Sequence, residues 1–504
     1  MKKIIDKKNL INLKNKFKKK KFILCHGVFD VIHYGHITHF NNAKKFGDIL
    51  IVSVTKDIYI KKGINGTIFN ELQRVKFLSE ISVIDYVYLC ETESAADSIK
   101  TIKPDFYVKG PDYRINSLDK TKKIYLEKKI VEKFNGKVVY TKDEKFSSSK
   151  IINEKNLNNY NSKQQYYINK IKNKYGYDYI KNQISKFKKL KILIIGELIF
   201  DSYCFGEIIG KSGKEPHLVL KENETEFYVG GTGAIARHLS SFVKNITLVS
   251  PFGNENFLKK VLKKTFNKNI NQILFKPDNN YSSIIKKRFI DKVSNYKMFG
   301  SYILPSQPKK NFSNVLISKI KSKFINSDIV IICDYGHDFL NKATANYISK
   351  IKKFKTLNAQ LNSSNMGYNS LNNYKNLEAV IINESELRQE FKAAKKDLNI
   401  LAKNLMKKNN IKNLVITKGK NGVILFRKNL SPIHCPAFVD QSIDKVGAGD
   451  AMLSIISLAL KQKINPEIVL FLGSIAAAVS VKNIGNKVSI DSEQLDRIIE
   501  FFFK

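Results

Sequence analysis

The sequence predicts two α/β domains joined by a polar segment, and three observations lead to this prediction. Short apolar stretches alternate with helical stretches before residue 150, and the same alternation returns after residue 190. This alternation is typical of parallel, doubly wound sheets. A length of 504 residues leaves room for two or three domains, and a hydrophobic fraction of 43% supplies apolar side chains for their cores.

The first domain is expected over residues 1–150. Apolar strands are predicted at 22–29, 49–55, 83–89 and 105–110. A helix is predicted to follow the first strand and to end at Gly47. Because the strands are continuous apolar runs, we expect them to lie in a parallel sheet that is covered on both faces.

Residues 151–189 differ in composition from the segments on either side. They are rich in Asn, Lys and Tyr and contain little Gly or Pro. We interpret this segment as a partly helical linker.

The second domain is expected over residues 190–504. Its predicted strands are 191–196, 246–249, 329–333, 379–382 and 414–417. Residues 207–229 alternate like short strands instead, which predicts a small β flap inserted in the α/β domain. Such flaps often cover a substrate.

The charge and the cysteines exclude several classes of protein. Five scattered cysteines without a CxxC pair argue against a disulfide scaffold and a structural zinc site. No apolar run reaches 18 residues, and lysines interrupt the N-terminus before a signal sequence can form. We therefore expect a soluble, reduced, cytoplasmic protein that has no membrane partner.

The net charge is strongly positive. There are 87 Lys and Arg residues against 45 Asp and Glu residues, a balance of +42. Because the lysines are spread along the whole chain, a solvated basic surface and a polyanion-binding face both remain open. Without a recognition motif, we do not expect a nucleic-acid partner.

The first candidate site follows the strand at 22–29. His33, Gly35 and His36 stand where a turn enters a helix. Free amides at a helix start attract anions, and two imidazoles three residues apart lie on one face of that turn. They can donate hydrogen bonds to a triphosphate and to charge developing on its α-phosphorus. The alternative is that the two histidines are surface residues or caps.

Residues 27–36, GVFDVIHYGH, resemble the signature of the cytidylyltransferase-like nucleotidyltransferases, a Rossmann-like family. Segments 70–74, 107–113 and 146–151 resemble later motifs of that family. The resemblance implies transfer of a nucleoside monophosphate from ATP or CTP, with Mg²⁺, and release of pyrophosphate. It implies that His33 and His36 are catalytic. The residues that it implies for nucleotide binding are Gly27, Phe29, Gly35, Arg74, Lys109, Ser147, Ser148 and Ser149. We interpret His39 as a structural or surface residue.

The second candidate site opens the apolar helix that follows residue 446. Gly447, Ala448 and Gly449 can leave amides free to form an anion hole for a transferring phosphate. Asp450, in the first turn, can accept a proton from a substrate hydroxyl. The alternative is a glycine-rich cap with an ordinary helix-start Asp.

Residues 444–450, DKVGAGD, resemble the signature of the ribokinase-like (PfkB) sugar kinases, with Asp450 as catalytic base. The resemblance implies sugar binding by Asp201, Gly230 and Gly231. It also implies that Glu386 orders Mg²⁺. The residues that it implies for nucleotide and phosphate binding are Asn383, Glu386, Thr417, Gly419, Gly422, Gly447, Ala448 and Gly449. Residues 476–485 resemble the helix and loop beside adenine.

Together the two halves resemble the bifunctional heptose enzymes of lipopolysaccharide precursor synthesis. Those enzymes phosphorylate a heptose 7-phosphate at O1 and then adenylylate the 1-phosphate, so we expect sugar phosphates and nucleotides as ligands. We also expect a homo-oligomer.

Several residues depart from that family. The domain order is reversed, Ala234 replaces Asn, His337 replaces Lys, and residues 358–363 replace an Asp-Pro-Lys stretch. Arg237, His238, Asn365 and Met366 belong either to an altered sugar pocket or to ordinary packing and loops. Two alternatives remain open: the same chemistry on another sugar or polyol phosphate, and a single-activity transferase whose kinase-like domain only binds a ligand.

Overall fold

The computed structural model describes residues 3–60, 63–64, 66–111, 123–141, 160–294, 296–305, 312–360, 371–439 and 444–504. The chain forms two compact units. The first contains Met1–Tyr160 together with Arg497–Lys504, and the second contains Asn161–Asp496. The segment expected to be a linker, 151–189, is therefore assigned to the second unit from Asn161 onward.

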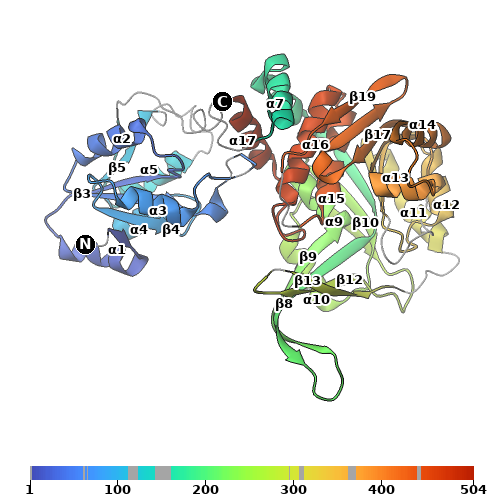
Figure 1. The fold of residues 1–504 in the computed structure, drawn as a ribbon, viewed down its shortest axis with the longest axis horizontal. Helices are drawn as coiled ribbons and strands as arrows, with labels where there is room; N and C mark the ends of the chain where they lie inside the picture. Colours follow the sequence, from blue (N-terminus) through green and yellow to red (C-terminus); the bar gives the residue numbers. More distant parts are fainter. Residues whose placement is uncertain are drawn as a thin grey trace. The chain divides into compact units, whose positions relative to one another are not determined.

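The first unit is built on a parallel sheet with the strand order β1-β4-β3-β2-β5-β6 (Figure 1). Its strands are β1 (Ile4–Ile5), β2 (Phe22–Gly27), β3 (Ile49–Thr55), β4 (Tyr86–Cys90), β5 (Phe106–Lys109) and β6 (Lys137–Tyr140). Its helices are α1 (Lys7–Lys16), α2 (Tyr34–Lys44), α3 (Glu71–Ser79), α4 (Ala96–Ile102) and α5 (Lys123–Lys133). Side chains alternate along each strand, so Leu24 enters one apolar cluster and Ile23 and Cys25 enter another. The predicted burial of both faces is confirmed.

The second unit contains, in its described part, a sheet with the strand order β11-β10-β7-β14-β15-β16-β17-β18-β19. Its strands are β7 (Lys191–Gly196), β10 (Asn245–Pro251), β11 (Ile270–Phe275), β14 (Ile329–Asp334), β15 (Phe354–Ala359), β16 (Leu377–Asn383), β17 (Ile411–Thr417), β18 (Val423–Arg427) and β19 (Leu430–Cys435). Pairing is parallel up to β17, and the last two strands are antiparallel.

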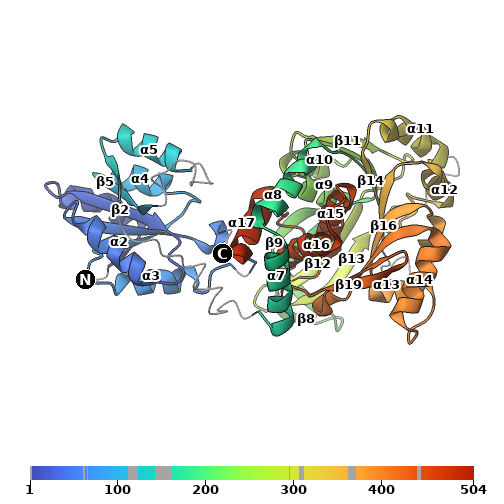
Figure 2. The ribbon, with the colours of Figure 1, turned by 90° about the horizontal axis from the view of Figure 1, so that it is seen from above.

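Helices cover both faces of this sheet (Figure 2). They are α9 (Thr232–Ser240), α10 (Asn256–Thr265), α11 (Phe312–Ile325), α12 (Lys342–Lys350), α13 (Glu384–Glu390), α14 (Leu398–Asn409), α15 (Ala448–Lys461) and α16 (Pro466–Ser480). Helix α17 (Ser492–Phe503) follows them, and its residues from Arg497 onward belong to the first unit. Helices α15 and α16 are apolar almost all round, which is typical of helices buried within a domain. The core on the other face receives side chains from α11, α12 and α14. The predicted α/β class is confirmed for both units.

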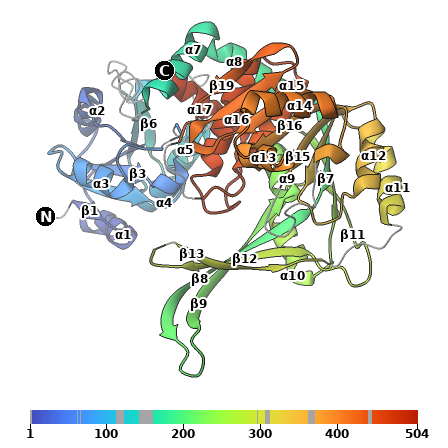
Figure 3. The same ribbon diagram turned by 45° about the vertical axis from the view of Figure 1, so that its right-hand side comes forward.

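A four-stranded flap with the strand order β13-β12-β8-β9 completes the second unit (Figure 3). Its strands are β8 (Leu198–Lys211), β9 (Leu218–Gly231), β12 (Ile284–Asp291) and β13 (Lys297–Ile303). The flap predicted at 207–229 forms part of the long β8–β9 hairpin. The observed flap is larger, because β12 pairs in parallel with β8 and brings β13 with it.

Two helices, α7 (Ser162–Lys174) and α8 (Tyr177–Ser185), occupy the segment expected to be a linker. The Tyr167 hydroxyl donates to the Glu467 carbonyl at 2.9 Å, and Lys170 and Lys174 each lie 2.8 Å from the Glu467 carboxylate. Helix α7 therefore packs on the second unit, at the start of α16. All five cysteines are free and buried, in agreement with the sequence analysis. None of the helices in the described ranges is both long enough and apolar enough to span a membrane.

Candidate active sites

Polar residues gather at the carboxyl ends of the parallel strands in the second unit. Glu197 follows β7, Asp334 ends β14, Asn383 ends β16 and Thr417 ends β17. The strand order reverses between β7 and β14, because the chain builds β10 and β11 on one side of β7 and β14 to β17 on the other. In open α/β sheets, ligands bind outside the carboxyl ends of the strands at such a reversal. This edge is therefore a candidate binding site.

Asp450 lies in the first turn of α15, and a hydrogen bond from Tyr335, in the loop after β14, connects it to this edge of the sheet. Gly447 caps the helix with a φ of 84°, and an added Cβ there would collide with the Asn486 side chain. The Tyr335 hydroxyl donates a hydrogen bond to Asp450 Oδ1 at 2.8 Å. Burial raises the pKa of Asp450 to about 7, although the bond from Tyr335 opposes this shift. A carboxyl with a pKa near neutrality is suited to general-base catalysis.

The start of α15 also offers backbone donors. The first amides of any α-helix have no acceptor within the helix, and the helix dipole favours negative charge beside them. Here those amides belong to Ala448, Gly449 and Asp450. An added Cβ at Gly449 would meet no atom within 4 Å, so the backbone is open there. A phosphate can therefore approach the amides next to the Asp450 carboxylate.

Asp201, on β8, is nearly fully buried beside a double glycine. Arg288 Nη1 lies 2.5 Å from its Oδ1, and Asn486 Nδ2 donates to its Oδ2 at 3.1 Å. An added Cβ at Gly230 would clash with this carboxylate, and Gly231 adopts a φ of 58°. Both glycines are thus required by the local geometry. Each carboxylate oxygen of Asp201 retains a lone pair that can accept from a sugar hydroxyl.

The loop that follows β14 contains a residue that the sequence identified only as a departure from a family pattern. His337 is 8% exposed, and its Nε2 has no hydrogen-bond partner among the described residues. Burial, with a smaller effect from Lys286, lowers the pKa of His337 to about 4. The His337 imidazole is therefore neutral at neutral pH. Because Lys286 also interacts electrostatically with Asp201 and Asp450, His337 lies near these two acids.

Asn383 and Glu386 form a reciprocal cap at the start of α13. The Glu386 amide donates to Asn383 Oδ1, and the Asn383 amide donates to Glu386 Oε2, both at 2.8 Å. This capping box fixes the Glu386 carboxylate at the strand edge. Within the described residues, no group of three acidic, His or Cys side chains is arranged to hold a metal ion.

The turn after β17 is shaped by glycines. Gly419 and Gly422 have φ angles of 56° and 84°, and an added Cβ at Gly422 would collide with the Cys435 carbonyl. Thr417 ends the strand beside them. The structure thus brings Thr417, Gly419 and Gly422 to the same strand edge as Asn383.

Two residues that the sequence left open have structural partners. Arg237 Nη2 donates to the Lys487 carbonyl at 3.1 Å, and His238 Nδ1 accepts from the Ile490 amide at 3.1 Å. Both side chains hold the loop at 486–490, which favours the packing interpretation. Asn365 and Met366 lie outside the described residues.

The first unit repeats this arrangement at its own sheet. Its strand order reverses between β2 and β5, which end at Gly27 and Lys109. His33 caps α2, and its ring stacks on that of His36 with 3.9 Å between centroids. Gly35 lies between them in the first turn. The two imidazoles therefore lie together at the start of α2, after one of the two strands between which the order reverses.

Phe29 packs against His36 and has a strained backbone conformation. Its φ is 51°, and its ring packs edge-on against His36 at 5.5 Å between centroids. The ring also lies over Gly27, where an added Cβ would come within 3.0 Å of it. Positive φ at a bulky residue is uncommon and is found at functional sites. Gly27 and Phe29 together shape the floor of the His33–His36 turn.

Arg74 is fully buried, and its observed partners are protein groups. The guanidinium donates to the Phe69 carbonyl at 3.1 Å, to the Thr55 carbonyl at 2.8 Å and to the Val28 carbonyl. Its Nη2 also pairs with Asp57 at 2.6 Å. In this conformation Arg74 holds the loops that surround the His33–His36 turn together.

The structure describes some of the remaining predicted residues of the first unit and leaves others outside the described ranges. Lys109 lies at the end of β5, 3.7 Å from Glu127 Oε2. His39 Nδ1 is 3.1 Å from Thr141 Oγ1, in agreement with a structural role. Ser147, Ser148 and Ser149 lie outside the described residues.

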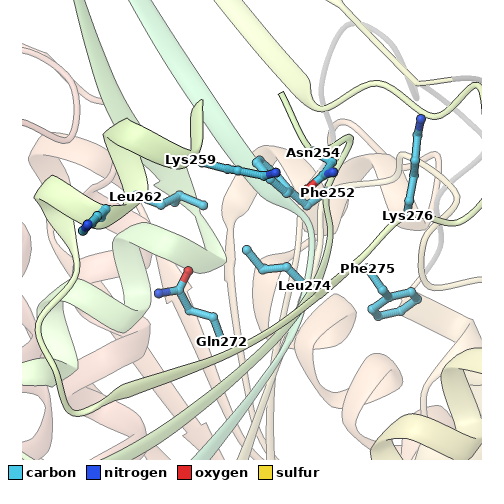
Figure 4. Close-up of a pocket in the computed structure, with 9 residues that line it drawn as sticks. Phe252, Asn254, Lys259, Leu262, Gln272, Leu274, Phe275 and Lys276 are labelled. Atoms are coloured by element: carbon cyan, nitrogen blue, oxygen red, sulfur yellow. The ribbon is translucent and has the colours of Figure 1, made fainter. Parts of the chain in front are cut away.

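Two cavities of the second unit are lined by described residues that do not include Asp450. One, of about 510 Å³, has an apolar floor with lysines at its rim (Figure 4). It is lined by Phe252, Asn254, Lys259, Leu262, Lys263, Gln272, Leu274, Phe275 and Lys276. Another, of about 730 Å³, includes the first residues of β15 and β16, at the opposite edge of the sheet. No predicted site residue lines either cavity.

Two α/β units, each with a parallel sheet that has a reversal of strand order, define the fold class of this protein. Residues 189–493, more than half of the chain, match the pfkB family of carbohydrate kinases. The chain belongs to this family. Residues 24–155 match the cytidylyltransferase-like family. The predicted kinase and nucleotidyltransferase domains are thereby confirmed.

The chain is also similar to individual proteins and to a solved structure. "Bifunctional protein HldE" of Campylobacter jejuni subsp. doylei is 36% identical over 153 residues, which are 30% of this chain and 31% of that protein. "Bifunctional protein HldE" of Histophilus somni is 23% identical over 322 residues, or 62% of this chain and 65% of that protein. The matches thus span less than two thirds of these relatives. The crystal structure of phosphofructokinase-2 from Escherichia coli in complex with potassium is similar in fold, with a TM-score of 0.51 and 15% identity over 62% of this chain and all of that chain.

Proposed function

We propose that this protein makes a nucleotide-activated sugar in two steps. The second unit phosphorylates a sugar phosphate with ATP, and the first unit transfers a nucleoside monophosphate to the resulting sugar 1-phosphate and releases pyrophosphate. The observation that carries the proposal is the placement of Asp450 beside the open amides of α15, close enough to Asp201 on the flap strand β8 for the charge of Asp201 to act on it.

In the kinase reaction, the oxygen of the acceptor hydroxyl attacks the γ-phosphorus of ATP, Asp450 accepts the hydroxyl proton, and the bond between the γ-phosphorus and the bridging oxygen breaks to release ADP. The amides of Ala448, Gly449 and Asp450 stabilise the charge on the transferring phosphoryl group. Asp201 orients the acceptor by hydrogen bonding. Mg²⁺ bound to the nucleotide phosphates would neutralise charge there, with Glu386 as the acid that orders it.

In the transferase reaction, no protein nucleophile is needed. The phosphate of the sugar 1-phosphate attacks the α-phosphorus of ATP or CTP directly. His33 and His36 donate hydrogen bonds to the triphosphate and to the charge that develops at the α-phosphorus. Lys109 adds a positive charge at the neighbouring strand end.

We propose heptose 7-phosphate, phosphorylated at O1, as the sugar. The cations Lys286 and Arg288 lie on the flap strand beside Asp201, where a second phosphate on the acceptor can be bound. A screen of heptose 7-phosphate and other sugar phosphates with ATP and with CTP, read by product mass, tests this. A larger yield from another acceptor, or from CTP, would change the substrate and leave the two reactions in place. The expected homo-oligomer stays a prediction that light scattering can measure.

Kinase turnover should rise with pH through neutrality. The pKa of Asp450 is raised to about 7, chiefly by burial. A general base must be deprotonated, so turnover should be low below that pKa and should level off above it. The measurement is kcat for ATP-dependent sugar phosphorylation between pH 5.5 and 9. A rate that is flat across this range would contradict the assignment of Asp450 as the base.

The two units should be separable into fragments. Because α7 is anchored on Glu467, a fragment of residues 160–504 should retain more stability than one beginning at residue 185. We expect it to phosphorylate sugar. A fragment of residues 1–160 should bind nucleoside triphosphate. Its fold should be less stable than the same unit in the whole chain. It lacks Arg497–Lys504, which belong to the same unit and include the buried Phe501 and Phe502.

Thermal melts and the two activities of each purified fragment measure the separation. If neither fragment folds alone but co-expression restores both activities, the division into independent units is wrong.

A further inference from the structure

Tyr335 connects the central sheet of the second unit to the proposed catalytic base. It lies in the loop directly after β14, at the reversal of strand order, and its side chain is buried. Its hydroxyl donates to Asp450 Oδ1 at 2.8 Å. Among the described residues, no other side chain or backbone group donates a hydrogen bond to the Asp450 carboxylate.

The backbone around Tyr335 is fixed by a buried acid on the adjacent strand connection. Glu197 Oε2 accepts from the Tyr335 amide at 3.0 Å, and Glu197 Oε1 accepts from the His337 amide at 3.3 Å. Asp334 Oδ1 accepts from the Gly336 amide at 3.0 Å. Three consecutive amides of this loop therefore donate to carboxyl groups. These contacts fix the backbone position from which the Tyr335 side chain reaches Asp450.

We propose that Tyr335 is a positioning residue for the kinase reaction: it holds Asp450 Oδ1 so that Oδ2 faces the acceptor hydroxyl. This inference rests on the proposed function of the second unit. Tyr335 does not need to exchange a proton, and it is not the base. Its contribution is to orient the carboxylate and to stabilise the ionised form that accepts the proton.

The electrostatics agree with a donor that stays protonated. Burial and then the charge of Asp450 raise the pKa of Tyr335 well above its ordinary value. The phenol therefore remains a hydrogen-bond donor across the working pH range. Its bond to Asp450 acts against the rise that burial causes in the pKa of that carboxyl. Without the hydroxyl, Asp450 should keep its proton to higher pH.

The test is Tyr335→Phe in the full-length protein, with ATP and the acceptor that gives the highest turnover in the substrate screen. A hydrogen bond to a charged group corresponds to roughly a ten- to hundredfold effect, so kcat at pH 7 should fall by about that factor. The KM for the acceptor should change less than about threefold, because the bond acts on the base. The rising limb of kcat should move about one unit to higher pH, and part of the loss should recover at pH 9.

Tyr374→Phe is the matched control. The Tyr374 hydroxyl is also buried and donates to a carboxylate, Asp334 Oδ2, at 2.7 Å. Its loss removes the same chemical group, a buried hydroxyl that donates to a carboxyl group, without removing the donor to Asp450. We expect this variant to melt at a temperature similar to that of Tyr335→Phe and to keep the wild-type position of the pH limb.

The outcomes separate this inference from the proposed function. If Asp450→Asn is inactive but Tyr335→Phe keeps the wild-type kcat and pH limb, the positioning role is wrong and the base stands. If both tyrosine variants lose activity equally without a shift of the limb, the effect is structural and the inference is overturned. If the wild-type protein phosphorylates none of the acceptors, the proposed function fails and this inference with it.

Discussion

Replacing Asp450 by asparagine should lower ATP-dependent sugar phosphorylation by about 10² to 10⁴ in kcat, the range that general-base catalysis contributes. Asparagine keeps the shape of the side chain and can still accept the hydrogen bond from Tyr335, but it cannot take a proton from the acceptor. Pyrophosphate release from a supplied sugar 1-phosphate should stay at the wild-type rate, because that reaction belongs to the other unit.

The two activities should be measured on the same purified protein, with its melting temperature as the control for folding. Burial disfavours the charged form of Asp450 and raises its pKa to about 7. Asparagine carries no charge to bury, so the asparagine variant should fold at least as well as the wild type. If phosphorylation continues unchanged in Asp450→Asn, the base must be another group, and the mechanism proposed for the second unit is wrong.

The α/β class and both helix-start motifs could be predicted from the sequence, because each depends on local patterns. Apolar strand runs such as 191–196 are buried on both faces of a parallel sheet, and this burial is visible in the sequence. Gly447 and His33 lie at helix starts, as predicted from the sequence. Motifs confined to one turn are fixed by neighbouring residues, so they can be predicted without knowledge of the tertiary fold.

The contacts of the candidate sites could not be predicted in this way. The hydrogen bond between Tyr335 and Asp450 joins residues 115 positions apart, and only the sheet order brings them together. The Arg74 guanidinium reaches the Val28 and Thr55 carbonyls from two other segments, and these partners are not indicated by the motif that contains Arg74. Which groups a buried guanidinium reaches is decided by packing, and no local pattern records it.

The size of the flap illustrates the same limit. Strand β12 contains three consecutive cations at 286–288, and β13 leaves most of its side chains exposed. Neither sequence has the continuous apolar pattern by which the other strands were predicted. The pairing of β12 with β8 places Lys286 and Arg288 beside Asp201, so these cations lie at the candidate site. Charged strands that line a site break the apolar pattern on which strand prediction depends.

Replacing His36 by alanine should nearly abolish pyrophosphate release while sugar phosphorylation continues. Loss of one donor to charge that develops in a transition state costs roughly 10² to 10³ in kcat. The variant also removes the ring that stacks on His33 and packs against Phe29, so the remaining imidazole loses its support. The assay supplies the sugar 1-phosphate directly and follows pyrophosphate, so the result does not depend on the kinase reaction.

His39→Ala is the matched control for His36→Ala, because His39 lies one turn further along α2 and contacts Thr141. It removes the same ring from the same helix, and it should keep pyrophosphate release within a few fold of the wild type. Equal losses in the two variants would point to damage to α2 and not to a missing donor. Loss of both pyrophosphate release and sugar phosphorylation in a folded His36→Ala protein would show that the two sites do not work independently, because His36 has no role in the proposed kinase mechanism.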